Sequence, residues 1–166
     1  MNHLHARPTE YAGITFRSKS EAMFAAALEE CGFRRDWVYE PEFLFAGEWI
    51  VDFALPIVTD HRYFQWQAIE YKPKRPTDTY LRELALRFTE IEKRESIVAW
   101  CVWVDWHSIK EDRFDWGALR LTCGEWQEQR RSYGATTLQL MPPFCGAHPD
   151  GFRAVANMRF DLSVSS

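Results

Sequence analysis

The feature that most constrains the fold is an unbroken apolar run at residues 97–104, which closely follows an amphipathic helical pattern at residues 78–94. A strand that is apolar on both faces needs cover on both, which is typical of a central strand in a sheet flanked by helices. Thr77 stands where the helix would be capped. The helical spacing predicts a buried stripe formed by Leu81, Leu84, Ala85, Phe88 and Ile91.

Upstream of this unit the sequence predicts one more helix and three strands. The helix spans residues 18–31, where Ser18-Lys19-Ser20-Glu21 fits a capping box and Gly32 is a stop signal. The order helix, three strands, helix, strand predicts an α/β domain with a mixed four-stranded sheet flanked by helices. The three strands are predicted at residues 35–39, 48–55 and 63–72.

The middle strand is predicted to cover residues 48–55 and to end at Pro56. Its alternation would place one set of side chains on each face. The first set is Trp49, Val51, Phe53 and Leu55, and the second is Ile50, Asp52 and Ala54.

Residues 1–105 are predicted to form the core, with an irregular arm at residues 1–16. Residues 106–166 are predicted to be a C-terminal extension packed on or beside that core. The signals in the extension are weaker, because aromatic residues, charges and glycines are mixed there. They predict a short strand at residues 138–141, a loop at residues 142–151 and a final helix at residues 152–160.

The composition is that of a folded protein. Of the 166 residues, 46% are hydrophobic and 16% aromatic, which is enough for one domain with a substantial core. No apolar run approaches the roughly 18 residues of a membrane span, and residues 1–5 lack the apolar stretch of a signal peptide. The sequence therefore predicts a cytoplasmic protein without a membrane segment.

The net charge of −4 counts against a general nucleic-acid binder, which is usually basic. The charge is uneven, however. Residues 72–95 carry seven basic and five acidic side chains, whereas residues 105–128 carry three basic and six acidic ones. The net charge therefore does not exclude contact with a nucleic acid through a local positive region.

The four cysteines lie far apart, and no Cys-x-x-Cys pair occurs. Cys31 and Cys101 stand in apolar stretches, which is typical of buried cysteines. The spacing of the remaining candidates matches no standard zinc pattern, so zinc binding is left open and not favoured. Those candidates are Cys123, Cys145, His107 and His148.

Three charged residues in the predicted strands carry the functional hypothesis. Asp52 is the single charge inside an otherwise apolar strand, and a buried carboxylate needs a cationic partner or a metal. Alternation places Glu70 and Lys72 on one face of their strand. Two carboxylates and a lysine on neighbouring strands can hold Mg²⁺ against a phosphate and activate a water. The pattern therefore predicts a metal-dependent nuclease.

Basic residues near these positions are candidates for nucleic-acid contact. Lys72-Pro73-Lys74-Arg75 forms a basic loop, and Arg17 and Lys19 flank the start of the first helix. We predict phosphate contacts from Lys74, Arg75, Arg17 and Lys19. A solvated loop explains Lys74 and Arg75 equally well.

The order of elements and the residues Asp52…Glu70-Tyr71-Lys72 resemble the PD-(D/E)XK nuclease superfamily. Two further stretches resemble its phage and transposon-associated members: Phe16-Arg17-Ser18-Lys19-Ser20-Glu21-Ala22, and Tyr39-Glu40-Pro41 followed by Val51-Asp52-Phe53. The resemblance covers about residues 14–105, and Val51 stands where the family usually has proline. It implies a restriction-endonuclease-like core and hydrolysis of DNA with Mg²⁺ or Mn²⁺, without an organic cofactor.

The resemblance also implies a role for each matching residue. Asp52 and Glu70 would bind the metal, with the Tyr71 carbonyl as a further ligand. Lys72 would orient or deprotonate the attacking water, or neutralise charge on the phosphate. Glu21 would approach the metal directly or through water. Asp52, Glu70, Lys72 and Glu21 thus form the implied catalytic set.

Other interpretations stay open. The capping box alone explains Glu21, and Asp52, Glu70 and Lys72 could form only a structural ion-pair cluster. The chain would then be a catalytically silent module that binds nucleic acid or a protein partner, or a subunit of a larger machine such as the end-cleaving subunit of a transposase. A homodimer is expected by analogy alone, since many enzymes of this fold cut two strands as dimers.

Overall fold

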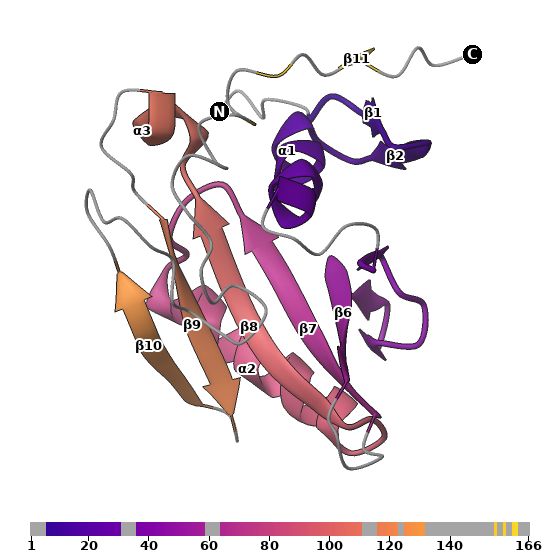
Figure 1. Cartoon of the computed structure of the whole chain (residues 1–166). Coiled ribbons are helices and arrows are strands. Elements are labelled where there is room, and N and C mark those ends of the chain that lie inside the picture. Colours follow the sequence, from indigo (N-terminus) through magenta and orange to yellow (C-terminus); the bar gives the residue numbers. More distant parts are fainter. Residues whose placement is uncertain are drawn as a thin grey trace.

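A computed structural model of the chain describes residues 6–30, 36–58, 64–110, 116–122 and 125–131, together with Val155, Met158 and strand β11 (Asp161–Leu162). Two helices, α1 (Lys19–Leu28) and α2 (Asp78–Glu92), pack on opposite faces of a mixed sheet (Figure 1). The chain is therefore of the predicted α/β class. Among the described residues, no helix is long and apolar enough to span a membrane.

Six strands form this sheet, in the order β10-β9-β8-β7-β6-β3. β7 and β8 run parallel, and the other neighbouring pairs are antiparallel. α2 connects the two parallel strands, since a parallel pair needs a long crossover. The strands are β3 (Val38–Tyr39), β6 (Phe53–Val58), β7 (Phe64–Lys72), β8 (Ile97–Val104), β9 (Trp116–Thr122) and β10 (Glu125–Arg131).

The sheet is larger than the four strands predicted. β9 and β10 come from residues assigned to the C-terminal extension, and they continue the sheet beyond β8 after a short helix, α3 (Trp106–Lys110). The sequence of β10 has no apolar alternation, so backbone pairing with β9 defines it as a strand. The strand, loop and final helix predicted after residue 137 lie outside the described residues, apart from Val155 and Met158. The zinc candidates Cys123, Cys145 and His148 also lie outside them.

Both helices begin at the predicted caps. Ser18 Oγ accepts the N–H of Glu21, and Thr77 Oγ1 accepts the N–H of Tyr80, each at 3.2 Å. The predicted stripe of α2 is buried at all five positions. α1 buries every residue from Ala22 to Leu28, most of them alanines, which lets the helix lie close to the sheet.

The single strand predicted at residues 48–55 is wrong. Residues 49–50 form β5 (Trp49–Ile50), which pairs with β4 (Phe45–Ala46) in a separate hairpin, and the chain bends before β6 begins. Val51 packs on the α2 side, but Phe53 packs on the α1 side, so the two do not share a face. β6 also continues through Pro56. β3 pairs only with residues 53 and 54 of β6, so Pro56 lies at the sheet edge, where a missing N–H is tolerated.

The predicted irregular arm is also wrong for residues 9–16. β1 (Thr9–Tyr11) and β2 (Ile14–Phe16) form a hairpin, and β11 pairs with the other edge of β1. The turn residues Ala12 and Gly13 both have positive φ, 52° and 78°, as a tight two-residue hairpin turn requires. An Ala-Gly pair is a weak hairpin signal, which explains why the sequence pattern missed it.

Candidate active site

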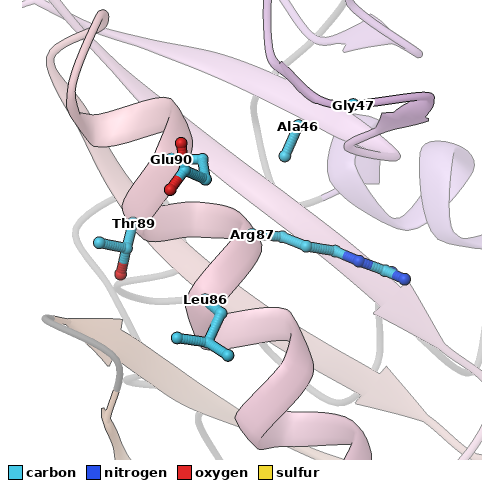
Figure 2. Close-up of a pocket in the computed structure, with 6 residues that line it drawn as sticks. All are labelled: Ala46, Gly47, Leu86, Arg87, Thr89 and Glu90. Carbon is cyan, nitrogen blue, oxygen red and sulfur yellow. The ribbon is translucent and has the colours of Figure 1, made fainter.

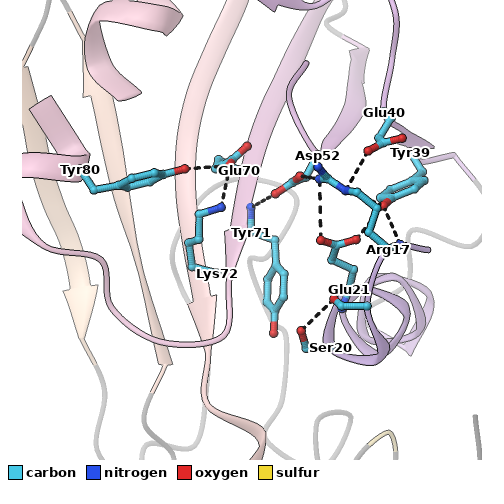
Figure 3. A network of polar contacts seen from close by, with 11 residues as sticks. Arg17, Ser20, Glu21, Tyr39, Glu40, Asp52, Glu70, Tyr71, Lys72 and Tyr80 are labelled. Atoms are coloured by element: carbon cyan, nitrogen blue, oxygen red, sulfur yellow. Dashed lines mark hydrogen bonds and ion pairs between the residues drawn. The ribbon is translucent and has the colours of Figure 1, made fainter. Parts of the chain in front are cut away.

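Asp52 and Glu70 meet where β6 and β7 lie side by side. Phe53 in β6 pairs with Ile69 in β7, so one step along the antiparallel register brings Asp52 across from Glu70. Asp52 Oδ2 accepts the backbone N–H of Tyr71 at 2.8 Å (Figure 3). Asp52 is 2% exposed and Glu70 3% exposed. The two predicted metal ligands are therefore buried neighbours at one end of the sheet.

The first part of the cluster, which we call the Glu70 half, consists of Glu70, Lys72 and Tyr80. Lys72 Nζ lies 2.8 Å from Glu70 Oε1, and the Tyr80 hydroxyl donates to the same oxygen at 2.9 Å. Lys72 Nζ also lies 5.1 Å from the centre of the Tyr80 ring. Glu70 Oε2 is buried and has no hydrogen-bond partner among the described residues. One oxygen of Glu70 is thus held firmly, and the other is available to a ligand.

The second part, the Asp52 half, consists of Arg17, Glu21, Tyr39, Glu40 and Asp52. The Arg17 guanidinium contacts Asp52 Oδ1, and it lies 2.9 Å from Glu40 Oε1 and 3.7 Å from Glu21 Oε1. The Tyr39 hydroxyl donates to Glu21 Oε2 at 2.6 Å and accepts the backbone N–H of Arg17 at 3.1 Å. Glu21 therefore faces the cluster, where its carboxylate contacts Tyr39 and Arg17.

Local backbone structure brings the Asp52 half together. Arg17 directly precedes Ser18, the N-cap of α1, so its side chain leaves the chain where β2 ends and the helix begins. Glu40 follows β3 and adopts a φ of 46°, which is uncommon for a residue other than glycine. The Glu40 N–H donates to the Asp52 carbonyl oxygen at 2.8 Å. This bond holds the end of β3 beside the bend before β6.

The electrostatics of the cluster keep Lys72 charged. Burial raises the pKa of Asp52, and the nearby charge of Glu70 raises it further, while Lys72 acts in the opposite direction. Burial lowers the pKa of Lys72, but Glu70 and Asp52 outweigh this effect, so the pKa of Lys72 is raised overall. Of the roles that the resemblance implies for Lys72, the raised pKa favours that of a cation, which orients water or neutralises phosphate charge, over that of a base.

The donor set fits a hard divalent cation. Four carboxylates face two cations, Arg17 and Lys72, which leaves two negative charges. Mg²⁺ prefers oxygen ligands and needs only one or two protein carboxylates, because it keeps several waters. Glu70 Oε2 and Asp52 supply that minimum. Within the described residues, no group of three His, Cys, Asp or Glu side chains is placed to form a complete protein cage for a metal. The Tyr71 carbonyl as a ligand stays a prediction.

Tyr80 and Tyr39 hold the carboxylates, and the sequence hypothesis assigned neither a role. Burial raises the pKa of both hydroxyls, so they remain protonated donors. Tyr39 belonged to a stretch that resembles the nuclease family, and this signal could have found it. Tyr80 lies in the first turn of α2, and its contact with Glu70 depends on how that helix packs.

The predicted nucleic-acid contacts lie around the cluster but are not equivalent. Lys19 and Lys74 are exposed, whereas Arg75 lies 3.5 Å from Asp78 and Arg17 is paired within the cluster. Two cavities adjoin the site, and Pro73 lines both of them. A cavity of about 270 Å³ is lined by Lys72, Pro73, Lys74, Arg75, Pro76, Thr77 and Tyr80. Another of about 260 Å³ is lined by Lys19, Ser20, Met23, Pro73, Asp105, Trp106 and His107.

A third cavity of about 450 Å³ lies away from the cluster, between α2 and the β4–β5 hairpin (Figure 2). Leu86 is 63% exposed on its wall, and Arg87 stacks on Trp49, with 5.4 Å between the guanidinium carbon and the ring centre. None of the predicted site residues lines this cavity. We therefore do not assign it to the site.

Comparisons with protein-family models, curated proteins and solved structures found no match. The α/β fold and the side-chain cluster are therefore the basis for any assignment of function. The resemblance to the PD-(D/E)XK superfamily stays a prediction.

Proposed function

We propose that the protein is a divalent-metal-dependent endonuclease of the PD-(D/E)XK type, which hydrolyses phosphodiester bonds in DNA. The observation that carries this proposal is that Asp52, directly before β6, lies across from Glu70 in β7, with Lys72 Nζ 2.8 Å from Glu70. Two adjacent buried carboxylates are unfavourable for stability, and such pairs are common at catalytic sites. A site that binds a dication gives a physical reason for the pair.

Each residue of the cluster has a role in this proposal. Asp52 and Glu70 would hold Mg²⁺ or Mn²⁺, which when bound polarises the phosphodiester and lowers the pKa of a coordinated water. Lys72 remains protonated and would stabilise the negative charge that develops on the phosphate. Tyr80 and Lys72 fix Oε1 of Glu70 and so orient its carboxylate. Glu21 would contact a metal-bound water, as the fourth member of the catalytic set.

The surroundings supply a path for a phosphate backbone. The two cavities on either side of Pro73 are lined by Lys74 on one side and by Lys19 on the other. Such a local run of cations can bind DNA although the whole chain is acidic. This arrangement supports a strand that crosses Pro73, with its scissile phosphate at Lys72.

The test is cleavage of supercoiled plasmid and of branched DNA in Mg²⁺, compared with EDTA. Asp52→Asn should lower the rate of cleavage by roughly 10²-fold or more, because it removes the charge of a metal ligand while keeping the shape of the side chain. The matched control is Asp36→Asn, which changes an exposed aspartate outside the cluster and should cleave like the wild type. Equal cleavage by wild type and Asp52→Asn, or cleavage that persists in EDTA, would contradict the proposal.

A catalytically silent module is the second candidate. The observation that favours it is that Arg17 and Lys72 already neutralise part of the cluster. Such a module would bind nucleic acid or a protein partner and would use the cluster only to hold β6, β7 and α1 together. Calorimetric titration with Mn²⁺ separates the candidates, because only a metal site should show binding that Glu70→Gln abolishes.

A further inference from the structure

We propose that Arg17 occupies the cation position at Asp52 in the metal-free protein and leaves it when a divalent cation binds. This inference rests on the proposed function. The guanidinium contacts Asp52 Oδ1 and also pairs with Glu40 and Glu21. One side chain therefore provides the positive charge for three carboxylates on one side of the cluster, including the metal ligand with the strongest claim.

A metal and Arg17 compete for Asp52. Its Oδ1 contacts Arg17 and its Oδ2 accepts the N–H of Tyr71, so both oxygens are engaged. A dication bound to Asp52 would lie close to the guanidinium, where little water screens the repulsion. Glu70 differs, because Lys72 and Tyr80 share Oε1 and leave Oε2 without a partner among the described residues. Only the Asp52 half needs to rearrange.

Arg17 is placed so that it can leave. Its side chain is 57% exposed, whereas that of Asp52 is 2% exposed, so the guanidinium approaches the buried carboxylate from the solvent side. Glu40, 38% exposed, remains as a partner nearer to water. A rotation of the Arg17 side chain is therefore sufficient, without a change in the sheet. Once released from Asp52, Arg17 stays beside the site with Glu40, where it would contact a phosphate as predicted from the sequence.

This competition makes metal affinity depend on Arg17. By linkage, a cation that stabilises metal-free Asp52 weakens metal binding by the same free energy. The probe is Mn²⁺ alone, titrated calorimetrically into wild type and Arg17→Met, which keeps a long side chain without the charge. Arg17→Met should bind Mn²⁺ at least about tenfold more tightly. The matched control is Lys93→Met, which removes a cation paired with Glu90 outside the cluster and should leave the affinity unchanged.

If Arg17 has a purely structural role, Arg17→Met loses a supporting contact, and its Mn²⁺ affinity should be equal to or weaker than that of the wild type. Either result would overturn the inference. Should Arg17→Met not fold, NMR measures solvent exchange of the Arg17 Nη2 protons in the wild type, because Nη2 is the nitrogen that contacts Asp52. This exchange should accelerate when Mg²⁺ saturates the site, and unchanged exchange would overturn the inference.

The two proposals fail in different ways. If neither wild type nor Arg17→Met binds Mn²⁺, the proposed function is wrong and the inference is wrong with it. If Asp52→Asn abolishes Mn²⁺ binding but Arg17→Met leaves it unchanged, the metal site stands and only the role of Arg17 is wrong.

Discussion

The Asp52 half and the Glu70 half of the cluster each place a buried carboxylate beside one cation and one tyrosine, yet they are built differently. The Glu70 half is compact in sequence, since Glu70, Lys72 and Tyr80 lie within eleven residues on β7 and the following helix. The Asp52 half joins residues from three separate parts of the chain, at positions 17–21, 39–40 and 52. Its cation is more than half exposed, whereas Lys72 is 30% exposed.

This difference shows how one site can combine a rigid ligand with an adaptable one. Glu70 is held by two partners on one oxygen, and its other oxygen has no hydrogen-bond partner within the part of the chain that the structure describes. Asp52 has both oxygens engaged, one of them by a side chain that reaches in from solvent. A cation that binds at the cluster can therefore contact Glu70 without a rearrangement, whereas Asp52 must first exchange a partner.

The largest expected difference between the halves is in stability. Lys72→Met should lower the free energy of unfolding by about 3 kcal/mol, because it leaves Glu70 as a buried charge with only Tyr80 as partner. Arg17→Met should lower it by only about 1–2 kcal/mol, since the guanidinium is largely exposed and Asp52 keeps the Tyr71 N–H. Urea denaturation without metal at pH 7 measures both. Equal losses would contradict the distinction between the halves.

A smaller effect should appear in the pH dependence of Asp52→Asn. The pKa of Asp52 is raised in the folded protein by burial and by Glu70, so its ionised form destabilises the fold. This destabilisation is absent below the ordinary pKa near 4. It grows as the pH rises from there to the raised pKa of the folded protein, and it is constant at higher pH. Asp52→Asn should therefore be more stabilising at pH 7 than at pH 4, measured by urea denaturation in EDTA. The control, Asp36→Asn, should show no such trend. If the stability gained by Asp52→Asn instead falls as the pH rises, Asp52 is stabilised as an anion and the prediction is wrong.

The smallest expected difference concerns the two tyrosines. Tyr39→Phe removes a hydroxyl that bonds to Glu21 and to Arg17, and it should lower the free energy of unfolding by about 2 kcal/mol. Tyr80→Phe removes one bond to Glu70 and should lower it by about 1 kcal/mol. Thermal unfolding of both variants, compared at the same pH, checks the order. If Tyr80→Phe loses more stability than Tyr39→Phe, the predicted order is wrong and the tyrosine of the Glu70 half contributes more to stability.

The parts of the fold that could be predicted are those with long, regular patterns. The apolar run 97–104 is β8, and the stripe behind Thr77 is α2, because their periodicity repeats over several turns or strand positions. The parts that were missed depend on partners distant in sequence. β10 is charged and pairs with β9, and the bend before β6 depends on a separate hairpin.

The same division holds for the candidate site. Glu70 and Lys72 could be placed on one face by alternation alone, and the single charge in an apolar stretch singled out Asp52. The contact of Arg17 with Asp52 could not be predicted, since it spans 35 positions and depends on where α1 begins relative to β6. The raised pKa of Lys72 could not be predicted either, because it depends on which carboxylates surround the amine.

By itself, the sequence determined the α/β class, the central strand and helix, and the local geometry of Glu70 and Lys72, because periodic patterns and nearest neighbours along one chain are sufficient for these. Only the tertiary structure decided that Asp52 lies across from Glu70, that Arg17 provides its charge and that two tyrosines hold the cluster. These features depend on strand register and helix placement, which are set by packing between segments far apart in the chain.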